Sequence, residues 1–431
     1  MRMVGGLSGV IGIGSAALMF AFTASHDSAS ADLGQAAVPR QLAGYSLLTG
    51  SVSDSPPGAA VALFQHGWGV EFLDFPQAVV LGAGGDVYRR VDVAEDRAGG
   101  ETQGDPAPML LSPNGTKVAV GDHDTDRPDV VVVDLVTGAT TTHPLPAGRS
   151  VVPVAWSSDG RTLASVLSPA PTNPYSGERI TGDVGLLDLD DDTTVVLPDD
   201  NVTAVAFSPD GSELAVEQAG SDDVRLSVVD LASGSARDLE AEGVLAGPTA
   251  WSPDGRLLAL TTTRPSGAPA GVDDPGIPTG LSFVDATGRG GGVPELMKLP
   301  LSGAGRVLGW TAPDEVVILL DVVKQEDCCG PEAATLSSVL LDGTEPRTLM
   351  RISDLTGYGV GRFQLAADTA DVLQVVSPAD VDRGPWPLPW RVALALLVGL
   401  VAWIAGRAVL RRRARSTALA QDPETRTSAF T

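Results

Sequence analysis

The stretch WSPDGRLLAL, residues 251–260, joins an aromatic residue, a tight turn and an apolar run. Proline fixes φ and glycine tolerates positive φ, so Pro-Asp-Gly favours a turn between two strands. Three related stretches are LSPNGTKVAV from Leu111, WSSDGRTLAS from Trp156 and FSPDGSELAV from Phe207. We therefore expect a repeated β-hairpin whose first residue, the anchor, ends an inner strand and packs between sheets.

The spacing of the anchors supports a repeat architecture. Two weaker copies are anchored on Trp310 and Leu365, and successive anchors are 45, 51, 44, 59 and 55 residues apart. A second hairpin follows the first five copies, as in VVVVDLVTGATTTHPL from Val130, often with an aspartate before its turn. Four strands per unit of this length are typical of a β-propeller blade.

The number of hairpins predicts how the ring closes. The sixth anchor hairpin has no outer hairpin after it, whereas AVVLGAGGDVYRRVDV, residues 78–93, is an outer hairpin without an anchor. Joining the two leaves no open sheet edge. The sequence predicts an all-β, six-bladed propeller of four-stranded blades over residues 78–377. Residues 42–66 would give a seven-bladed alternative if they paired with 78–93.

These repeats resemble the TolB-type, WD-like propeller repeats of bacterial envelope proteins, on the strength of FSPDG, WSPDG, WSSDG and LSPNG. The chain also resembles membrane-anchored envelope propellers of actinobacteria. The resemblance implies a fold and a cell-envelope location. It implies no single activity, because propellers host many functions.

Two apolar segments indicate a membrane protein. Residues 1–31 read as a signal peptide or an N-terminal membrane anchor, followed by an extension over 32–77. Residues 391–410 are predicted to be a transmembrane helix, with a juxtamembrane linker at 378–390 and a basic cytoplasmic tail at 411–431. The alternative for residues 391–410 is a buried core helix. The chain would cross the cytoplasmic membrane once or twice, through its own helices, with the propeller outside.

The charge balance limits the partners. The chain has 54 acidic and 29 basic residues and a net charge of -25. Such a surface repels nucleic acid, so no nucleic-acid partner is expected.

Few residues suggest a catalytic or metal-binding site. The four histidines show no metal-ligand spacing, and no nucleophile motif occurs, so we expect no catalytic residues and no enzyme activity. Asp122, Asp124 and Asp126 alternate as Ca²⁺ ligands often do, but the later glycine and glutamate of an EF-hand loop are missing, so a solvated inter-strand loop is the favoured interpretation. Adjacent Cys328 and Cys329 could form a strained vicinal disulfide, stay free or pair with another chain.

The sequence therefore predicts a non-catalytic binding module in the cell envelope, with an envelope protein, peptide or glycan as partner. No cofactor is expected apart from the candidate Ca²⁺. The alternative is a metal-dependent, lactonase-like propeller hydrolase with carboxylates at the central channel. A third reading is a sensor that signals through its tail, although the arginines of the tail already serve as a topology signal.

Overall fold

The computed structural model describes residues 36–67, 76–99, 104–173, 179–220, 224–265, 276–301, 305–321, 333–353 and 359–420. The chain divides into two compact units. The described part of the first is residues 36–383, and that of the second is residues 384–420.

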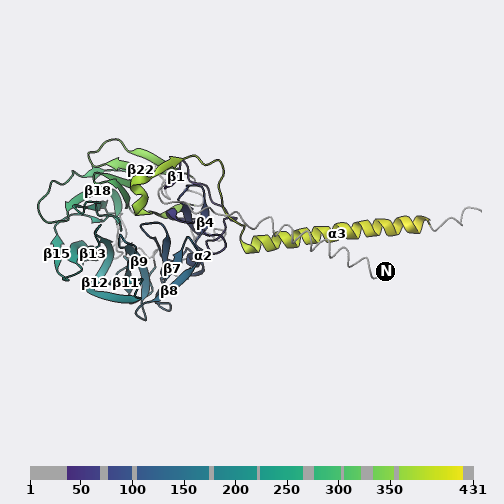
Figure 1. Cartoon of the computed structure of the whole chain (residues 1–431), viewed down its shortest axis with the longest axis horizontal. Helices are drawn as coiled ribbons and strands as arrows, with labels where there is room; N and C mark the ends of the chain where they lie inside the picture. Colours follow the sequence, from purple (N-terminus) through teal and green to yellow (C-terminus); the bar gives the residue numbers. More distant parts are fainter. Residues whose placement is uncertain are drawn as a thin grey trace, which may run out of the picture. The chain divides into compact units, whose positions relative to one another are not determined.

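The larger unit is a propeller-like ring of antiparallel sheets, set side by side around a common centre (Figure 1). Within the described residues, four of these sheets have four strands each. Three of the four follow chain order: β5 (Met109–Leu111), β6 (Lys117–Val120), β7 (Asp129–Asp134) and β8 (Thr140–Pro144); β16 (Val244–Leu245), β17 (Leu257–Arg264), β18 (Ile277–Asp285) and β19 (Met297–Lys298); and β20 (Val307–Ala312), β21 (Glu315–Asp321), β22 (Ala334–Leu340) and β23 (Arg347–Ile352).

A seven-stranded sheet stands between the first and second of these. Its strands are β9 (Ser150–Trp156), β10 (Thr162–Ser168), β11 (Gly182–Asp188), β12 (Thr193–Phe207), β13 (Glu213–Ala219), β14 (Val224–Asp230) and β15 (Ala236–Leu239). The predicted six, or alternatively seven, four-stranded blades are therefore seen only in part, since four four-stranded sheets occur within the described residues. The physical reason is that β12 runs from Thr193 to Phe207 and pairs with both β11 and β13, which joins two groups of strands into one sheet.

The fourth four-stranded sheet, called the closing sheet, combines both ends of the propeller sequence. Its order is β24 (Val360–Leu365), β2 (Ala60–His66), β3 (Gln77–Gly82) and β4 (Tyr88–Arg90), and α2 (Asp92–Asp96) follows β4. Closure by both ends is confirmed, but the expected division of strands is wrong. Residues 60–66 pair with β24, so they belong to this sheet and not to a seventh blade.

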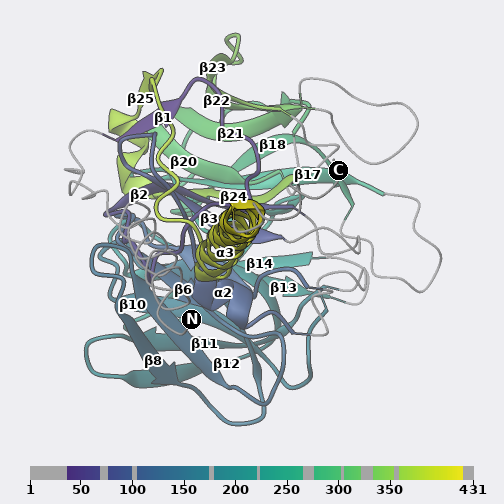
Figure 2. The same cartoon turned by 90° about the vertical axis from the view of Figure 1, so that its right-hand side faces the viewer.

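The sixth anchor hairpin does not form. After Leu365 the chain makes a 3-10 helix, η3 (Ala367–Val372), and then β25 (Gln374–Val376). The stretch after Leu365 lacks the glycine that the four clear copies place at positive φ, namely Gly115, Gly160, Gly211 and Gly255. Without this glycine the tight turn would be strained, and the chain forms a 3-10 helix instead. β25 pairs in parallel with β1 (Ala37–Pro39), beside which it lies in Figure 2.

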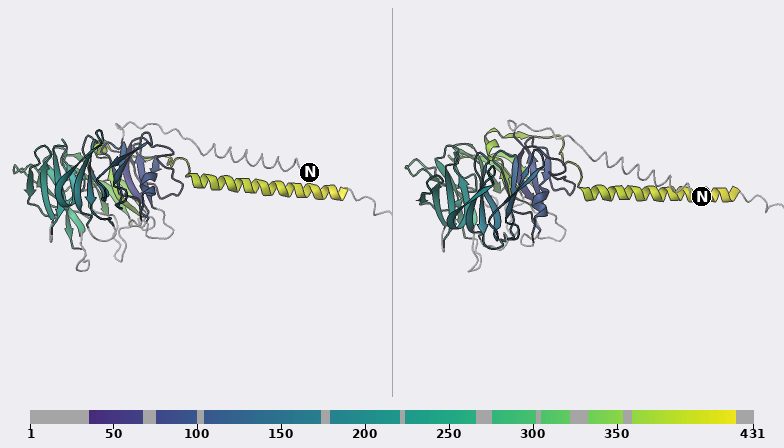
Figure 3. Two further views of the ribbon diagram at one scale, coloured as in Figure 1. Left: turned by 90° about the horizontal axis from the view of Figure 1, so that it is seen from below. Right: turned by 60° about the horizontal axis from the view of Figure 1, so that its bottom comes forward.

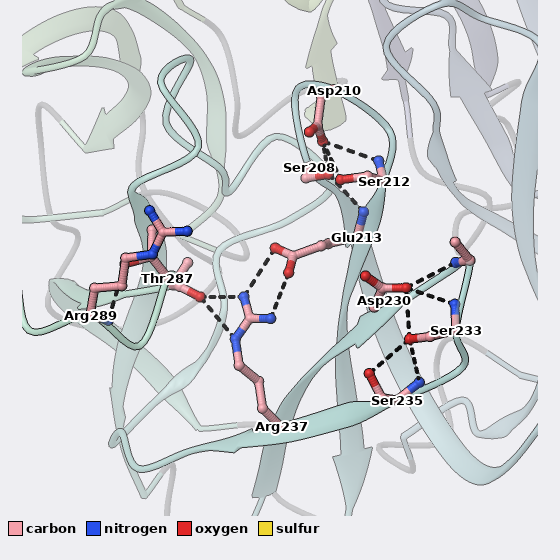
Figure 4. Close-up of polar contacts among 12 residues, drawn as sticks. Ser208, Asp210, Ser212, Glu213, Asp230, Ser233, Ser235, Arg237, Thr287 and Arg289 are labelled. Atoms are coloured by element: carbon pink, nitrogen blue, oxygen red, sulfur yellow. Dashed lines mark hydrogen bonds and ion pairs between the residues drawn. The ribbon is translucent and has the colours of Figure 1, made fainter.

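The repeated Ser-Pro-Asp-Gly turn is held by side-chain hydrogen bonds. In the copy at 251–260, the Ser252 hydroxyl donates to the carboxylate of Asp254 at 2.6 Å and accepts from the Leu257 N–H at 2.8 Å. The Ser208 and Asp210 copy makes the same contacts (Figure 4). Each bond adds about 1 kcal/mol, which explains why the motif recurs.

The aspartate before the outer turn has a similar structural role. Asp230 accepts hydrogen bonds from the N–H groups of Ala232 and Ser233 (Figure 4), and Asp134 accepts from Val136 and Thr137. The aspartate thus closes the turn, which explains why it recurs before the outer turns.

The anchors join neighbouring sheets. The indole N–H of Trp251 donates to the carbonyl of Ala206, in the preceding sheet, at 3.0 Å. The indole N–H of Trp156 donates to the carbonyl of Leu110, also in the preceding sheet, at 3.3 Å. Both rings are buried within apolar clusters that contain residues of two sheets. The prediction that the anchors pack between sheets is confirmed for Trp156 and Trp251.

The smaller unit is one continuous helix, α3 (Leu388–Ala420), drawn as a single rod in Figure 3. Within Leu388–Ala414 a stretch of 18 residues has a mean hydropathy of 2.2, and in the described chain this is the helix that is long and apolar enough to cross a membrane. The predicted N-terminal segment, residues 1–31, lies outside the described residues.

Candidate binding site in the central channel

The inner strands of the ring enclose two connected cavities. The first, of about 520 Å³, lies where the anchors end the inner strands, and we call it the apolar chamber. The second, of about 560 Å³, lies where the inner strands begin, and we call it the basic chamber. Both volumes fall in the range of ligand sites in proteins.

Aromatic and proline side chains line the apolar chamber. The anchors Trp156, Phe207, Trp251 and Trp310 form part of its wall. The repeated turns add four prolines around its opening: Pro113, Pro209, Pro253 and Pro313. Because the indole N–H groups already bond to the backbone, these rings are held rigidly and present apolar surface.

Two carboxylates stand at the same end. Asp368 and Asp371, from η3, line the apolar chamber. Burial, and then the charge of Asp371, raise the pKa of Asp368 above its ordinary value. The opening of this chamber is therefore apolar with one acidic edge.

The two chambers share part of their lining. Leu110, Pro248, Arg306 and Gln364 line both cavities. The side chain of Gln364 bridges two inner strands, since it accepts from the Leu111 N–H at 2.8 Å and donates to the Met109 carbonyl at 2.9 Å. Gln364 is thus held in place by backbone contacts at the boundary of the two chambers.

Arg306 enters the channel immediately before β20. Its aliphatic stem passes over Gly247, where an added Cβ would lie 3.4 Å from three of its carbons. The side chain is exposed to the channel and lines both cavities. Loss of bulk solvent, and then the charge of Arg362, lower the pKa of Arg306, while Glu217 opposes the shift. The guanidinium nevertheless stays charged at neutral pH.

Arg362 reaches the basic chamber from a β-bulge in β24. The pairing with β2 shifts register between Leu63 and Gln65, and Arg362 has a φ of 51°. A left-handed conformation costs a non-glycine residue about 1–2 kcal/mol. The bulge turns the side chain toward the channel, and its Nη1 donates to the Pro106 carbonyl at 3.1 Å. Burial lowers the pKa of Arg362, and Asp105 opposes the shift.

His123 and Glu217 complete the polar lining. The Nδ1 of His123 lies 2.7 Å from the Thr172 hydroxyl, whereas its Nε2 is buried and has no hydrogen-bond partner among the described residues. Burial, and then the charge of Arg362, lower the pKa of His123 to about 4, so the ring is neutral at neutral pH. The Glu217 carboxylate accepts from the Thr203 hydroxyl and the Leu245 N–H.

The predicted Ca²⁺ ligands lie on the loop between β6 and β7. Asp122 is buried and pairs with Arg97, with Nη2 and Oδ2 3.4 Å apart, while Asp126 is exposed. Asp122 also accepts from the N–H of Asp124 at 2.9 Å. In the part of the chain that the structure describes, no group of three or more His, Cys, Asp or Glu side chains could hold a metal ion. Cys328 and Cys329 lie outside the described residues.

Sequence reasoning did not single out Arg306 or Arg362. The signal available was an arginine at the start of, or within, an otherwise apolar inner strand. Their convergence depends on the curvature of the ring, which no local motif encodes.

Comparison with known proteins gives a likeness of fold. No family profile and no curated protein matches the chain. It is similar to TolB from Acinetobacter baumannii, with a TM-score of 0.49 and 18% identity over 72% of this chain and 67% of that one. It is also similar to a putative TolB from Agrobacterium tumefaciens, with a TM-score of 0.41 and 14% identity over 72% and 99% of the two chains.

A partial likeness is found with acylaminoacyl peptidase from Pyrococcus horikoshii, with a TM-score of 0.32 and 18% identity over 47% of this chain and 32% of that one. β-Propellers, TolB among them, are thus the solved structures that this chain is similar to, as the repeats predicted. The propeller assignment itself rests on the strand pairing described above.

Proposed function

We propose that this chain is a membrane-anchored β-propeller of the cell envelope that binds a protein segment at the apolar chamber and catalyses no reaction. The observation that carries the proposal is the ring of turn prolines around an aromatic-lined cavity. Rigid apolar surface in a concave site is what a binding module offers to apolar side chains of a partner.

We also infer that the ring has six blades. The seven-stranded sheet is then counted as two four-stranded blades that share β12. In support, residues 193–197 of β12 pair with β11, whereas residues 204–207 pair with β13.

The membrane-spanning segment in this proposal is α3, with the propeller outside the cytoplasmic membrane and residues 411–431 inside. The length and hydropathy of α3 support it, as do four arginines, at 411, 412, 413 and 415, that follow the apolar part. Reporter fusions test the orientation. Alkaline phosphatase fused after residue 383 should be active, and green fluorescent protein fused after residue 431 should fluoresce. The reverse pattern would place the propeller in the cytoplasm.

Binding is tested by chemical cross-linking in cells, followed by mass spectrometry of the captured proteins. The control keeps the membrane segments of this chain and carries an unrelated domain. A matched pair of variants, Pro253→Glu at the chamber and Thr141→Glu on the outer strand β8, separates the apolar chamber from the rest of the surface. We expect one envelope protein to be captured by the wild type and by Thr141→Glu, and lost with Pro253→Glu. Capture no richer than in the control would refute a protein partner and direct attention to glycans.

A further inference from the structure

We propose that the basic chamber binds a small molecule through an oxyanion group, a carboxylate or a phosphate, held between Arg306, Arg362 and His123. This site lies at the other end of the channel from the apolar chamber. It therefore goes beyond the proposed function and can be tested apart from it.

The first argument is the state of Arg306. Its side chain is exposed and lines the chamber, and its guanidinium makes no hydrogen bond or ion pair with any residue that the structure describes. The like charge of Arg362 acts on it, and the charge of Glu217 opposes that effect. A guanidinium with free N–H groups fits the two oxygens of a carboxylate or phosphate.

The second argument is the state of His123. This residue is 4% exposed, lines the same chamber and has an Nε2 without a partner in the described residues. Thr172 fixes the ring through Nδ1. If Nδ1 accepts the proton of the Thr172 hydroxyl, Nε2 carries a hydrogen and can donate to an oxyanion. A buried polar atom left open in this way needs an explanation, and a bound anion supplies one.

The third argument is the contrast of charge. Among the described residues that line the basic chamber, Arg306 and Arg362 stand against one carboxylate, that of Glu217. Both oxygens of Glu217 already accept hydrogen bonds, from Thr203 and Leu245, and Asp105 offsets part of the charge of Arg362. The chamber is thus positive inside a chain of net charge -25, so it attracts small anions that the outer surface repels.

The volume of the basic chamber limits the size of the ligand. About 560 Å³ accommodates a small molecule and its water, and Arg306 lies where this chamber borders the apolar chamber. Arg306 immediately precedes the inner strand β20 and Arg362 lies on the inner strand β24, so an anion between them would also link two parts of the ring.

The test is calorimetric titration of the full-length protein in detergent with citrate and, separately, with inorganic phosphate. Sodium chloride of matched ionic strength is the reference. We expect saturable binding of at least one of the two anions, and the one that binds identifies the group as carboxylate or phosphate. Arg306→Gln should weaken that binding at least tenfold, and His123→Ala should weaken it severalfold. Arg161→Gln, which changes an exposed ion pair with Asp190, should bind like the wild type.

Thermal unfolding without anion distinguishes lost binding from lost folding. Arg306→Gln removes a repulsion with Arg362 that is larger than the attraction to Glu217, and it removes no hydrogen bond, so its melting temperature should equal or exceed that of the wild type. Absence of saturable binding of both anions by the wild type would overturn the proposal. So would equal affinity of Arg306→Gln and the wild type, or the same heat with chloride.

Discussion

The side chain of Arg89 is fully buried and forms an ion pair with Asp382, which lies 293 residues further along the chain; Nη2 and Oδ2 are 3.0 Å apart. Arg383, the next residue, stacks on Tyr88 with its guanidinium carbon 5.7 Å from the ring centre. The backbone pairs as well, since the Tyr88 N–H donates to the Asp382 carbonyl at 2.8 Å. The end of the propeller sequence is thereby fastened to β4.

Breaking this ion pair should destabilise the ring. Asp382→Ala leaves the Arg89 charge buried without its carboxylate, although Arg89 keeps a bond to the Ser55 carbonyl. Because the Asp382 side chain is 29% exposed, we expect a loss of about 2–3 kcal/mol in the free energy of unfolding. Denaturant unfolding of the full-length protein measures it.

The matched control is Asp190→Ala, which breaks the ion pair between Arg161 and Asp190. Both of those side chains are more than half exposed, so the loss should stay within about 0.5 kcal/mol. Equal losses in the two variants would show that the contact between Arg89 and Asp382 does not help to close the ring.

Trp251→Phe tests the contact between sheets. The change keeps most of the buried apolar surface and removes the hydrogen bond from the indole N–H to the Ala206 carbonyl. We expect a loss of about 1–2 kcal/mol, measured as a lower unfolding midpoint. Trp386→Phe, at an exposed tryptophan, should leave the midpoint unchanged. An unchanged unfolding midpoint for Trp251→Phe would mean that the anchor stabilises the fold through its buried volume alone.

His66 predicts a pH dependence. Burial, and then the charge of Arg383, lower the pKa of His66 from 6.5 to about 4 in the folded protein. The unfolded chain therefore binds more protons between these values. The contribution of His66 to the free energy of unfolding is complete above about pH 6.5. It is lost as the pH falls toward 4, and the loss amounts to about 3 kcal/mol. Urea unfolding at several pH values should give a shallower slope for His66→Gln than for the wild type. An unchanged slope would refute the contribution of this histidine.

Calcium should have no effect on stability. Asp122 already has Arg97 as its cationic partner, and Arg97 also binds Asp129 at 2.7 Å. We expect the melting temperature of the full-length protein to be the same with a chelator and with added Ca²⁺. A calcium-dependent rise that Asp122→Asn abolishes would instead support the three aspartates as ligands.

The sequence predicted the elements that local chemistry determines. The turns around Asp210 and Asp254, the outer-turn aspartates and the apolar C-terminal helix all follow from residues that are near one another in the chain. The partner of β24 did not follow in this way. Residues 60–66 were identified only as strand-like, and their choice of β24 over a seventh blade depends on the geometry of the whole ring.

The candidate sites were predictable to a smaller degree. The anchors Trp156 and Trp251 were recognised as packing residues, but their shared cavity with the turn prolines is a property of the closed ring. Arg306 and Arg362 are 56 positions apart and belong to no motif. They meet because two inner strands of different sheets face the same axis.

The most direct test of protein binding at the apolar chamber is site-specific photo-cross-linking in cells. A photoreactive residue is placed at exposed Pro253, at exposed Pro313 and, as a control, at exposed Thr141 on the outer strand β8. The account predicts that the same envelope protein is captured from Pro253 and Pro313 and not from Thr141. Capture from Thr141 alone, or of unrelated proteins from the two proline positions, would contradict it.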